Sequence, residues 1–218
     1  MKRILVANRG EIACRIIRAC HAMGIESVAV FSDPDRDALF VREADTAVSL
    51  GGATPGESYL KIDAIVDAAK RAGADAVHPG YGFLAENATF AKAVADAGLT
   101  LIGPTPESIE AMGSKVEAKR RMEGADVPLL PSVVVKDQST DDLLKECDRL
   151  GFPVLVKASA GGGGRGMRIV RSAKEFPRAL DAARQEAESA FGDASVFIEP
   201  YVEKPRHVEV QVFGDTHG

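Results

Sequence analysis

A run of glycines shortly after a lysine is the part of this sequence best suited to chemistry. Residues 161–164 are four consecutive glycines that follow Lys157 and precede Arg165 and Arg168. Glycine loses more backbone entropy on folding than other residues, and a tight hairpin needs only about two loop residues. The excess is explained if backbone N–H groups approach anionic oxygens, with the Lys157 ammonium beside them. The pattern predicts a flap that closes over phosphate groups, in preference to a mobile surface hairpin.

Two other phosphate-binding loops do not fit this stretch. A Walker P-loop requires Gly-Lys-Ser/Thr at the start of a helix, and no such sequence follows residues 161–164. A dinucleotide fingerprint lies between a strand and a helix, but this run lies between two predicted strands. Asp33 follows another predicted strand and could bind a ribose in such a fold. No G-x-G-x-x-G follows the first strand, so we expect the first sheet to be a scaffold instead.

Other polar residues have weaker individual cases. Lys115 alone is typical of a solvated helix charge, and His207 alone of an exposed strand histidine. His78 precedes a proline in a glycine-rich turn, which favours a structural hydrogen bond. Glu86 and Asn87 are expected to cap or begin a helix. Residue type by itself therefore assigns no function to these positions.

The first half of the chain alternates between strands and helices. Short apolar runs predict strands at residues 3–7, 27–31, 46–50, 76–78 and 100–102. Helical spacing of apolar residues predicts helices at residues 12–20, 59–69 and 86–97. Gly24 and Gly73 are suited to end the first two of these helices. The fold class predicted is α/β, with a doubly wound parallel sheet and helices on both of its faces.

A second segment of α+β character follows a region rich in proline and glycine. Two short helical pieces split near Gly113, and prolines at 128 and 131 then exclude a regular helix. Further helices are predicted at residues 140–150 and 173–191, and strands at 153–158, 167–170, 195–199 and 207–213. We therefore expect a first domain of residues 1–113 and a second of residues 114–218.

Composition limits the class of function. The content of 45% hydrophobic and 27% charged residues is typical of soluble globular proteins, and the net charge of −5 argues against a nucleic-acid-binding surface. The three cysteines have neither metal-ligand nor disulfide spacing, so we expect buried thiols and a reducing, cytoplasmic setting. No signal-peptide pattern and no apolar run of membrane-spanning length is present, so no membrane partner is expected.

Several short motifs occur in one recognisable order. They are ANRGEIA at residues 7–13, HPGYGFLAEN at 78–87, IGP at 102–104, MGSK at 112–115, KASAGGGGRGMR at 157–168, EPYV at 199–202 and PRHVEVQ at 205–211. Together they resemble the biotin carboxylase branch of the ATP-grasp superfamily, over the whole chain. The resemblance implies a biotin carboxylase N-terminal (pre-ATP-grasp) domain followed by an incomplete ATP-grasp domain.

The resemblance also implies an activity. The enzyme would be an ATP-dependent ligase in which bicarbonate is phosphorylated to carboxyphosphate with Mg²⁺ or Mn²⁺, and the carboxyl group passes to N1 of biotin on a carrier. Implied partners are a biotin carboxyl carrier domain or protein, a carboxyltransferase, and a second copy in a homodimer or larger complex. The implied compartment is the cytoplasm, or the mitochondrial matrix after processing.

Residue roles follow from the matching motifs. Lys115 and Lys157 would neutralise the ATP phosphates, and Gly163 and Gly164 would lend backbone N–H groups from the flap. His207 would lie in the nucleotide pocket.

The same resemblance assigns the adenine contacts. Glu199, Pro200, Tyr201 and Val202 would line the adenine. The family more often has lysine where this chain has Pro200, but the carbonyl that adenine N6 needs is retained, and Val202 offers an N–H for adenine N1. Ala160 stands where many members have glycine, which reduces the freedom of the flap slightly.

The family's remaining machinery is not expected in this chain. Its magnesium-binding glutamates, bicarbonate base and biotin-side arginine would lie after Gly218, so we expect no catalytic residue and no metal ligand here. We expect a truncated chain, and no biotin carboxylation by residues 1–218 alone.

The resemblance leaves several functions open. An acyl-CoA carboxylase, such as an acetyl- or propionyl-CoA enzyme, is the first hypothesis, and pyruvate or urea carboxylase the second. A non-catalytic nucleotide-binding module is the third, although both lysines and the flap glycines are retained. A carbamoyl-phosphate-synthetase-like enzyme is disfavoured by the motif at residues 78–87.

Overall fold

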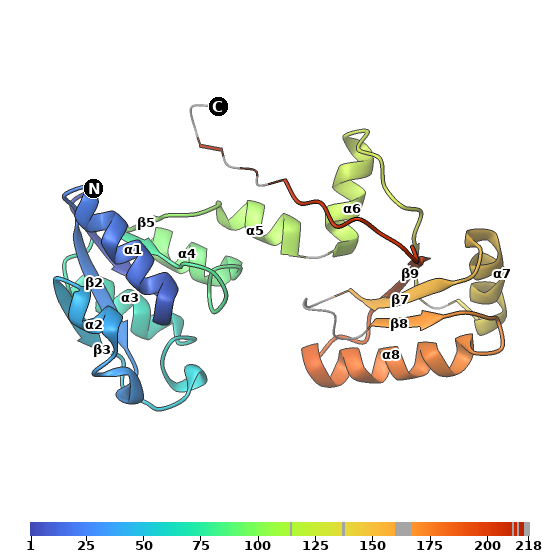
Figure 1. The fold of residues 1–218 in the computed structure, drawn as a ribbon, viewed down its shortest axis with the longest axis horizontal. Helices are drawn as coiled ribbons and strands as arrows, with labels where there is room; N and C mark the ends of the chain where they lie inside the picture. Colours follow the sequence, from blue (N-terminus) through green and yellow to red (C-terminus); the bar gives the residue numbers. More distant parts are fainter. Residues whose placement is uncertain (114, 137, 160–166, 211, 213, 216–218) are drawn as a thin grey trace. The chain divides into compact units, whose positions relative to one another are not determined.

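The protein, seen here as a computed structural model, forms two units, Met1–Gly113 and Ser114–Gly218 (Figure 1). The residues that the structure describes are 1–113, 115–136, 138–159, 167–210, 212 and 214–215. The side chains of Lys115 and Phe191 also lie outside the described part. Each unit has its own sheet and its own hydrophobic core.

The first unit is built on a five-stranded sheet in the order β3-β2-β1-β4-β5. The strands are β1 Arg3–Val6, β2 Glu26–Phe31, β3 Thr46–Ser49, β4 Ala76–His78 and β5 Thr100–Leu101. All neighbouring pairs are parallel, and at the centre Leu5 of β1 is paired with Val28 on one side and Val77 on the other. The predicted doubly wound parallel sheet is therefore confirmed.

Helices cover both faces of this sheet. The helices on these faces are α1 Gly10–Ala22, α2 Leu39–Glu43, α3 Ile62–Arg71 and α4 Ala88–Asp96, while α5 Pro106–Gly113 packs against α4. The short 3₁₀ turns are η1 Asp33–Asp35 and η2 Pro55–Glu57. Residues alternate between the faces along a strand, so Ile4 and Val6 pack with Ile17 of α1 and Phe40 of α2. Burial on both faces explains why the strands are continuous apolar runs.

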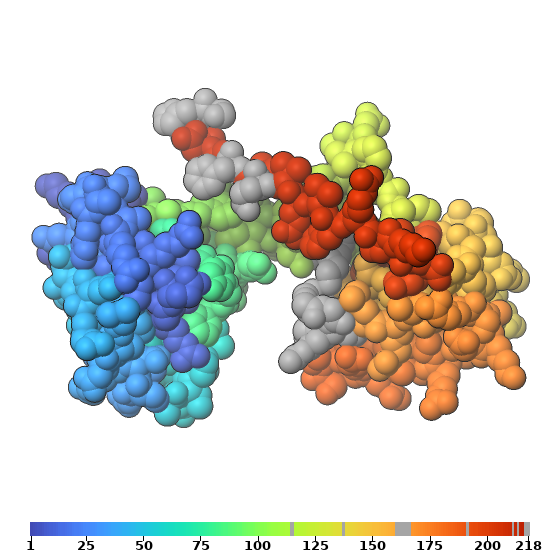
Figure 2. Space-filling view, viewed as in Figure 1, coloured from blue at the N-terminus to red at the C-terminus, as the bar shows by residue number. Residues whose placement is uncertain are grey.

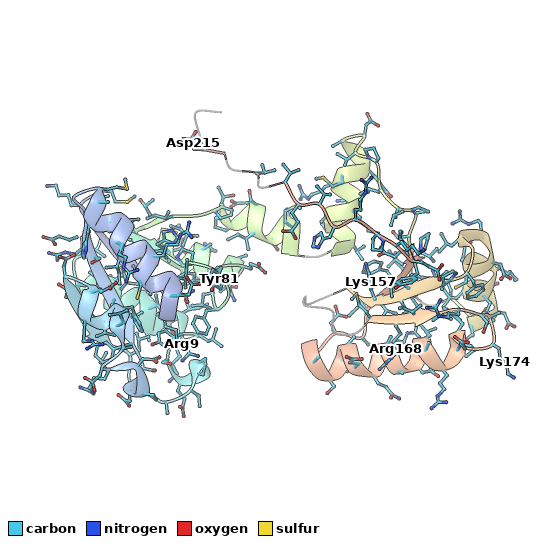
Figure 3. The ribbon with its side chains drawn as sticks, in the orientation of Figure 1. Arg9, Tyr81, Lys157, Arg168, Lys174 and Asp215 are labelled. Atoms are coloured by element: carbon cyan, nitrogen blue, oxygen red, sulfur yellow. The ribbon has the colours of Figure 1, made fainter. Side chains whose placement is uncertain are left out.

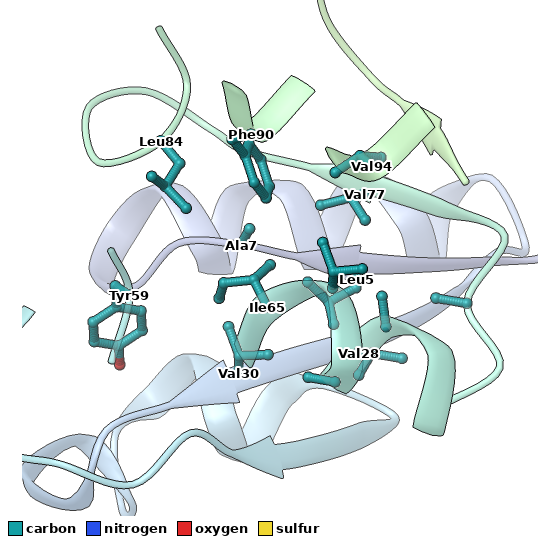
Figure 4. Packing of buried hydrophobic residues seen from close by; sticks show 14 residues of the cluster. Leu5, Ala7, Val28, Val30, Tyr59, Ile65, Val77, Leu84, Phe90 and Val94 are labelled. Atoms are coloured by element: carbon teal, nitrogen blue, oxygen red, sulfur yellow. The ribbon is translucent and has the colours of Figure 1, made fainter. Parts of the chain in front are cut away.

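The opposite face of the sheet packs on α3 and α4. Figure 4 shows Leu5, Val28 and Val77 of the strands in one cluster with Ile65 of α3 and Phe90 of α4. All five side chains are fully buried. Each buried side chain of this size contributes about 1.5–3 kcal/mol to folding, so this layer stabilises the first unit substantially.

Tyr59 lies before α3, although the sequence predicted it inside that helix. Its ring stacks on Phe83 with centroids 5.2 Å apart. Its hydroxyl donates to Asp35 Oδ2 at 2.7 Å and accepts from the Ser32 N–H at 3.1 Å. These contacts with residues distant in sequence hold Tyr59 outside the helix. The helical spacing of Tyr59 from Ile62 therefore wrongly indicated that Tyr59 belongs to α3.

Two predicted local hydrogen bonds are confirmed. The Gly80 N–H donates to His78 Nδ1 at 3.0 Å, and burial lowers the pKa of His78, which favours the neutral ring that this bond requires. Asn87 is the N-cap of α4, and its side chain accepts from the Phe90 N–H at 2.8 Å.

The second unit is an antiparallel sheet with three helices. The strands lie in the order β6-β9-β7-β8 and are β6 Val133–Val134, β7 Val154–Ala158, β8 Met167–Val170 and β9 Val196–Pro200. The helices are α6 Lys115–Gly124, α7 Thr140–Leu150 and α8 Phe176–Phe191. One face of the sheet, with Val156 and Ile198, packs on Leu143 of α7 and Phe176 of α8. The predicted α+β character is confirmed.

The strand predicted at residues 207–213 is wrong for the part of it that the structure describes. Residues 205–210 and 212 have no strand geometry, and residues 211 and 213 lie outside the described residues. Val208 and Val210 are 79% and 81% exposed, and Figure 2 shows this stretch in red on the surface. Alternating valines indicate a strand only where a neighbouring strand pairs with them and a core covers one face.

The cysteines are buried free thiols, as predicted. Cys14 and Cys20 lie in α1 and Cys147 in α7. Burial raises the pKa of Cys147 to about 11, so its reactive thiolate is scarce at neutral pH. Within the described residues, every helix is too short or too polar to cross a membrane.

Candidate functional site

Lys157 and Glu199 meet on the face of the second sheet that points away from α7 and α8. In the register of β7 and β9, Lys157 lies opposite Phe197, and Leu155 lies opposite Glu199. Lys157 and Glu199 are therefore diagonal neighbours on one face, within reach of long side chains. Lys157, labelled near the end of β7 in Figure 3, donates a hydrogen bond from Nζ to Glu199 Oε1.

A second lysine reaches the same carboxylate from helix α6. Lys119 donates from Nζ to Glu199 Oε2 at 2.8 Å. The ring of Phe197 lies beneath both ammonium groups, with its centroid 5.1 Å from Lys119 Nζ and 6.0 Å from Lys157 Nζ. Each oxygen of one carboxylate thus has its own lysine, and an aromatic face supports both cations.

This cluster carries an excess of positive charge. Burial favours the neutral form of Glu199, but the hydrogen bonds from Lys119 and Lys157 outweigh it and hold the pKa of Glu199 below its usual value. Two ammonium groups therefore surround one ionised carboxylate. The Glu199 side chain is 8% exposed, and the lysine side chains are 24% and 25% exposed. Such a partly desolvated cationic cluster is suited to bind an additional anion.

The segment after Glu199 has a fixed path. Pro200 ends β9, and the Tyr201 N–H donates to the Pro153 carbonyl at 2.9 Å. Val202 follows with 46% of its surface exposed. The predicted adenine contacts of these residues remain a prediction.

The remaining predicted residues are not brought to the cluster within the described part of the chain. The side chain of His207 is 82% exposed, and its Nε2 lies 2.9 Å from Glu209 Oε1. Gly163, Gly164 and the side chain of Lys115 lie outside the described residues. Their roles stay predictions.

The sequence did not lead us to predict Lys119 as a site residue, although its spacing from Lys115 could have indicated it. It lies four residues after Lys115 in α6, and residues at this spacing share one helix face. Lys119 also lines a cavity of about 220 Å³ between α6 and the sheet, together with Val116, Val134 and Phe197. Among the described residues, no group of three or more His, Cys, Asp and Glu could hold a metal ion.

In the first unit, a buried side chain joins two loops at the position where open parallel sheets commonly bind ligands. That position lies at the carboxyl ends of the central strands. Here Asn8, which follows β1 and is 4% exposed, donates from Nδ2 to the carbonyls of Pro79 and Tyr81 at 2.8 Å each. The side chain of Asn8 thus joins the loop after β1 to the loop after β4.

Comparison with known families gives a match to each unit. Residues 1–109 match the family described as "Biotin carboxylase, N-terminal domain". Residues 114–218 match "Carbamoyl-phosphate synthase L chain, ATP binding domain".

Curated relatives match over the whole chain. The chain is 51% identical over 218 residues to the alpha subunit of mitochondrial methylcrotonoyl-CoA carboxylase from Glycine max, covering 100% of this chain and 30% of the relative. It is 49% identical to biotin carboxylase of Halalkalibacterium halodurans, covering 100% and 48%. It is 50% identical to one subunit of pyruvate carboxylase from Methanothermobacter thermautotrophicus, covering 99% and 44%. The chain therefore spans less than half the length of these relatives.

Solved structures agree with this result. A biotin carboxylase–βγ-ATP complex from Campylobacter jejuni is similar with a TM-score of 0.93 and 44% identity, covering 99% of this chain and 48% of that one. The biotin carboxylase domain dimer of Hydrogenobacter thermophilus 2-oxoglutarate carboxylase, with MgADP, ADP and bicarbonate, has a TM-score of 0.86 and 46% identity, covering 93% and 44%. On the match to the first unit and the similarity over the whole length, this chain belongs to the biotin carboxylase family.

Proposed function

We propose that this chain supplies the ATP-binding part of an enzyme that carboxylates biotin on a carrier. The cluster of Lys119, Lys157 and Glu199 carries this proposal, because its excess positive charge is suited to the phosphates of a nucleotide. Support comes from relatives that are named biotin carboxylase and from similar structures that are described as holding an ATP analogue or MgADP with bicarbonate.

The proposed reaction has two steps. A bicarbonate oxygen attacks the γ-phosphorus of ATP, the bond to the β-phosphate oxygen breaks, and carboxyphosphate and ADP form. N1 of biotin, after losing its proton, attacks the carboxyl carbon, and inorganic phosphate leaves. The transferred phosphoryl group spreads negative charge over its oxygens, so positioned cations lower the barrier.

The residues of this chain serve the nucleotide in the proposal. Lys157 and Lys115 neutralise phosphate charge, and Gly163 and Gly164 donate backbone N–H groups to it. His207 approaches the nucleotide once ATP is bound.

The adenine in this proposal lies against the end of β9. Glu199, Pro200, Tyr201 and Val202 line it, and the Pro200 carbonyl accepts from adenine N6. Mg²⁺ would supply positive charge that neutralises the charge developing on the phosphates, and residues outside this chain would hold it.

In this proposal a separate carboxyltransferase selects the final acceptor, to which biotin passes the carboxyl group. Acyl-CoA and pyruvate enzymes among the relatives are almost equally identical to this chain, at 51% and 50%. The proposal is therefore the half-reaction that they share, with a biotin carboxyl carrier as partner and a second copy in a homodimer. The proposed compartment is the cytoplasm or the mitochondrial matrix, and the names of the plant relatives describe those proteins as mitochondrial.

The test is the complete reaction of the full-length protein. Labelled bicarbonate should enter carrier-bound biotin only when ATP and Mg²⁺ are present, with one ADP released per carboxyl group. Lys157→Gln should lower kcat/KM for ATP by about 100-fold or more, as loss of a positioned donor does. Lys145→Gln is the control, since this lysine is 75% exposed and pairs with Asp142 on α7.

Two outcomes would overturn the proposal. A wild-type protein that binds ATP without transferring carboxyl groups would be a non-catalytic nucleotide-binding module. Equal activity of Lys157→Gln and Lys145→Gln would remove Lys157 from the site.

A further inference from the structure

We propose that Lys119 is a positioning residue for ATP, because it neutralises Glu199 and so allows Lys157 to bind phosphate. The inference rests on the proposed function and assigns a role to a lysine that the sequence did not single out. Lys119 acts through Glu199 and Lys157 and needs no contact with ATP itself.

The burial of Glu199 makes a permanent counter-charge necessary. Its side chain is 8% exposed, so an ionised carboxylate here has little solvent to stabilise it. Leaving such a charge without its partner is strongly unfavourable. If Glu199 had a single lysine as its partner, that lysine could therefore not move to a ligand without a large cost in free energy.

The geometry removes this conflict. Lys119 binds Oε2 and Lys157 binds Oε1, so the two lysines do not compete for one oxygen. When Lys157 turns to a phosphate, Lys119 still compensates the carboxylate. Without Lys119, Glu199 and Lys157 would form a closed pair with no excess charge, and phosphate would have to break it.

Lys119 lies closer than Lys157 to the aromatic ring beneath the two ammonium groups. Its Nζ lies 5.1 Å from the centroid of the Phe197 ring, and that of Lys157 lies 6.0 Å away. A cation over an aromatic face is stabilised without a further anion. Lys119 also extends from a helix, whereas Lys157 is next to the last residue of β7. In this arrangement Lys119 stays with the Glu199 carboxylate, and Lys157 binds the ligand.

The test uses the full-length protein and three variants. Lys119→Met keeps the length of the side chain without its charge, and Lys119→Arg keeps the charge. Arg121→Met is the matched control, because it removes a charge from the same helix at a side chain that is 55% exposed. We expect Lys119→Met to raise KM for ATP about tenfold, an effect between those of one unit charge in bulk water and near a protein surface. The kcat should change less than about twofold, and Lys119→Arg should restore KM.

Two further measurements separate positioning from a structural role. Adenosine lacks phosphates, so its Kd should be the same for the wild type and Lys119→Met. In a Glu199→Gln background the carboxylate charge is absent, and Lys119→Met should then have no effect on KM for ATP. A structural role would instead weaken adenosine and ATP equally and would lower Tm in both backgrounds.

The outcomes distinguish the two proposals. If the wild type does not carboxylate biotin, the proposed function fails. If the wild type is active but Lys119→Met leaves KM for ATP unchanged, or weakens adenosine as much as ATP, the positioning role fails and the proposed function stands.

Discussion

A single methyl group at Gly80 should destabilise the first unit through two separate effects. The backbone φ of Gly80 is +65°, and a Cβ built on it lies 2.9 Å from Asn8 Nδ2 and 3.2 Å from Ile12 Cγ1. Asn8 Nδ2 already donates to the carbonyls of Pro79 and Tyr81. Gly80→Ala therefore imposes a left-handed backbone on alanine and also displaces the amide that joins the loops after β1 and β4.

The magnitude follows from these two effects. A left-handed conformation costs a non-glycine residue about 1–2 kcal/mol. Each hydrogen bond lost by the Asn8 amide costs about 1 kcal/mol net. The expected loss is about 3 kcal/mol, a substantial part of the 5–15 kcal/mol typical of a folded domain. Gly82→Ala is the matched control, because Gly82 has a φ of +67° with no atom within 4 Å of its Cβ position. It should cost only about 1–2 kcal/mol.

Hydrogen–deuterium exchange of the full-length protein in increasing denaturant can measure this loss of unfolding free energy in the first unit alone. Peptides from β1 and β4 report the free energy at which the first sheet opens. We expect a drop of about 3 kcal/mol for Gly80→Ala and a smaller one, about 1–2 kcal/mol, for Gly82→Ala. Equal drops would refute the steric argument, and no drop in either variant would refute the strain argument as well.

Two further predictions concern the hydrogen-bonded acids of the first unit. Asp45 accepts from the N–H and hydroxyl of Ser27 at 2.8 Å each, and these bonds lower its pKa from 3.8 to about 2. The ionised Asp45 therefore stabilises the fold above about pH 4, and this contribution is lost as the pH falls toward 2. The difference in unfolding free energy between the wild type and Asp45→Asn should shrink over that window. A difference that stays constant with pH would contradict this. Tyr59→Phe removes the hydroxyl that donates to Asp35 and accepts from Ser32, and should cost about 1–2 kcal/mol in denaturant unfolding; no measurable loss would mean that water replaces both bonds.

Local periodicity was sufficient for most of the elements. The run at residues 3–7 predicted β1 because a strand buried on both faces is apolar at every position. The helix expected at residues 12–20 is α1, since its buried residues recur at helical spacing. Two short elements, α2 and β6, were not predicted. Five residues in α2 and two in β6 are too few to show a period, and tertiary contacts decide their conformation.

The candidate site was harder to predict because it depends on pairing between distant segments. Lys157 and Glu199 are 42 residues apart in sequence, and Lys119 and Glu199 are 80 apart. Each residue type could be recognised as a candidate, but a carboxylate shared by two lysines follows only from the positions of α6, β7 and β9. The resemblance named Lys157 and Glu199 as separate contacts of the nucleotide. It did not indicate that each is the other's partner.

The register of β7 and β9 is therefore as important to this site as the residues themselves. Glu199 lies on the same face as Lys157 because Leu155 is its partner across the two strands. Shifting β9 by one residue would turn Glu199 toward the core that holds Val156 and Phe176, where a carboxylate would have no lysine. The buried ion cluster and the apolar core thus favour the same register from opposite faces of the sheet. The register that buries the core of the second unit is consequently also the one that places Glu199 beside Lys157.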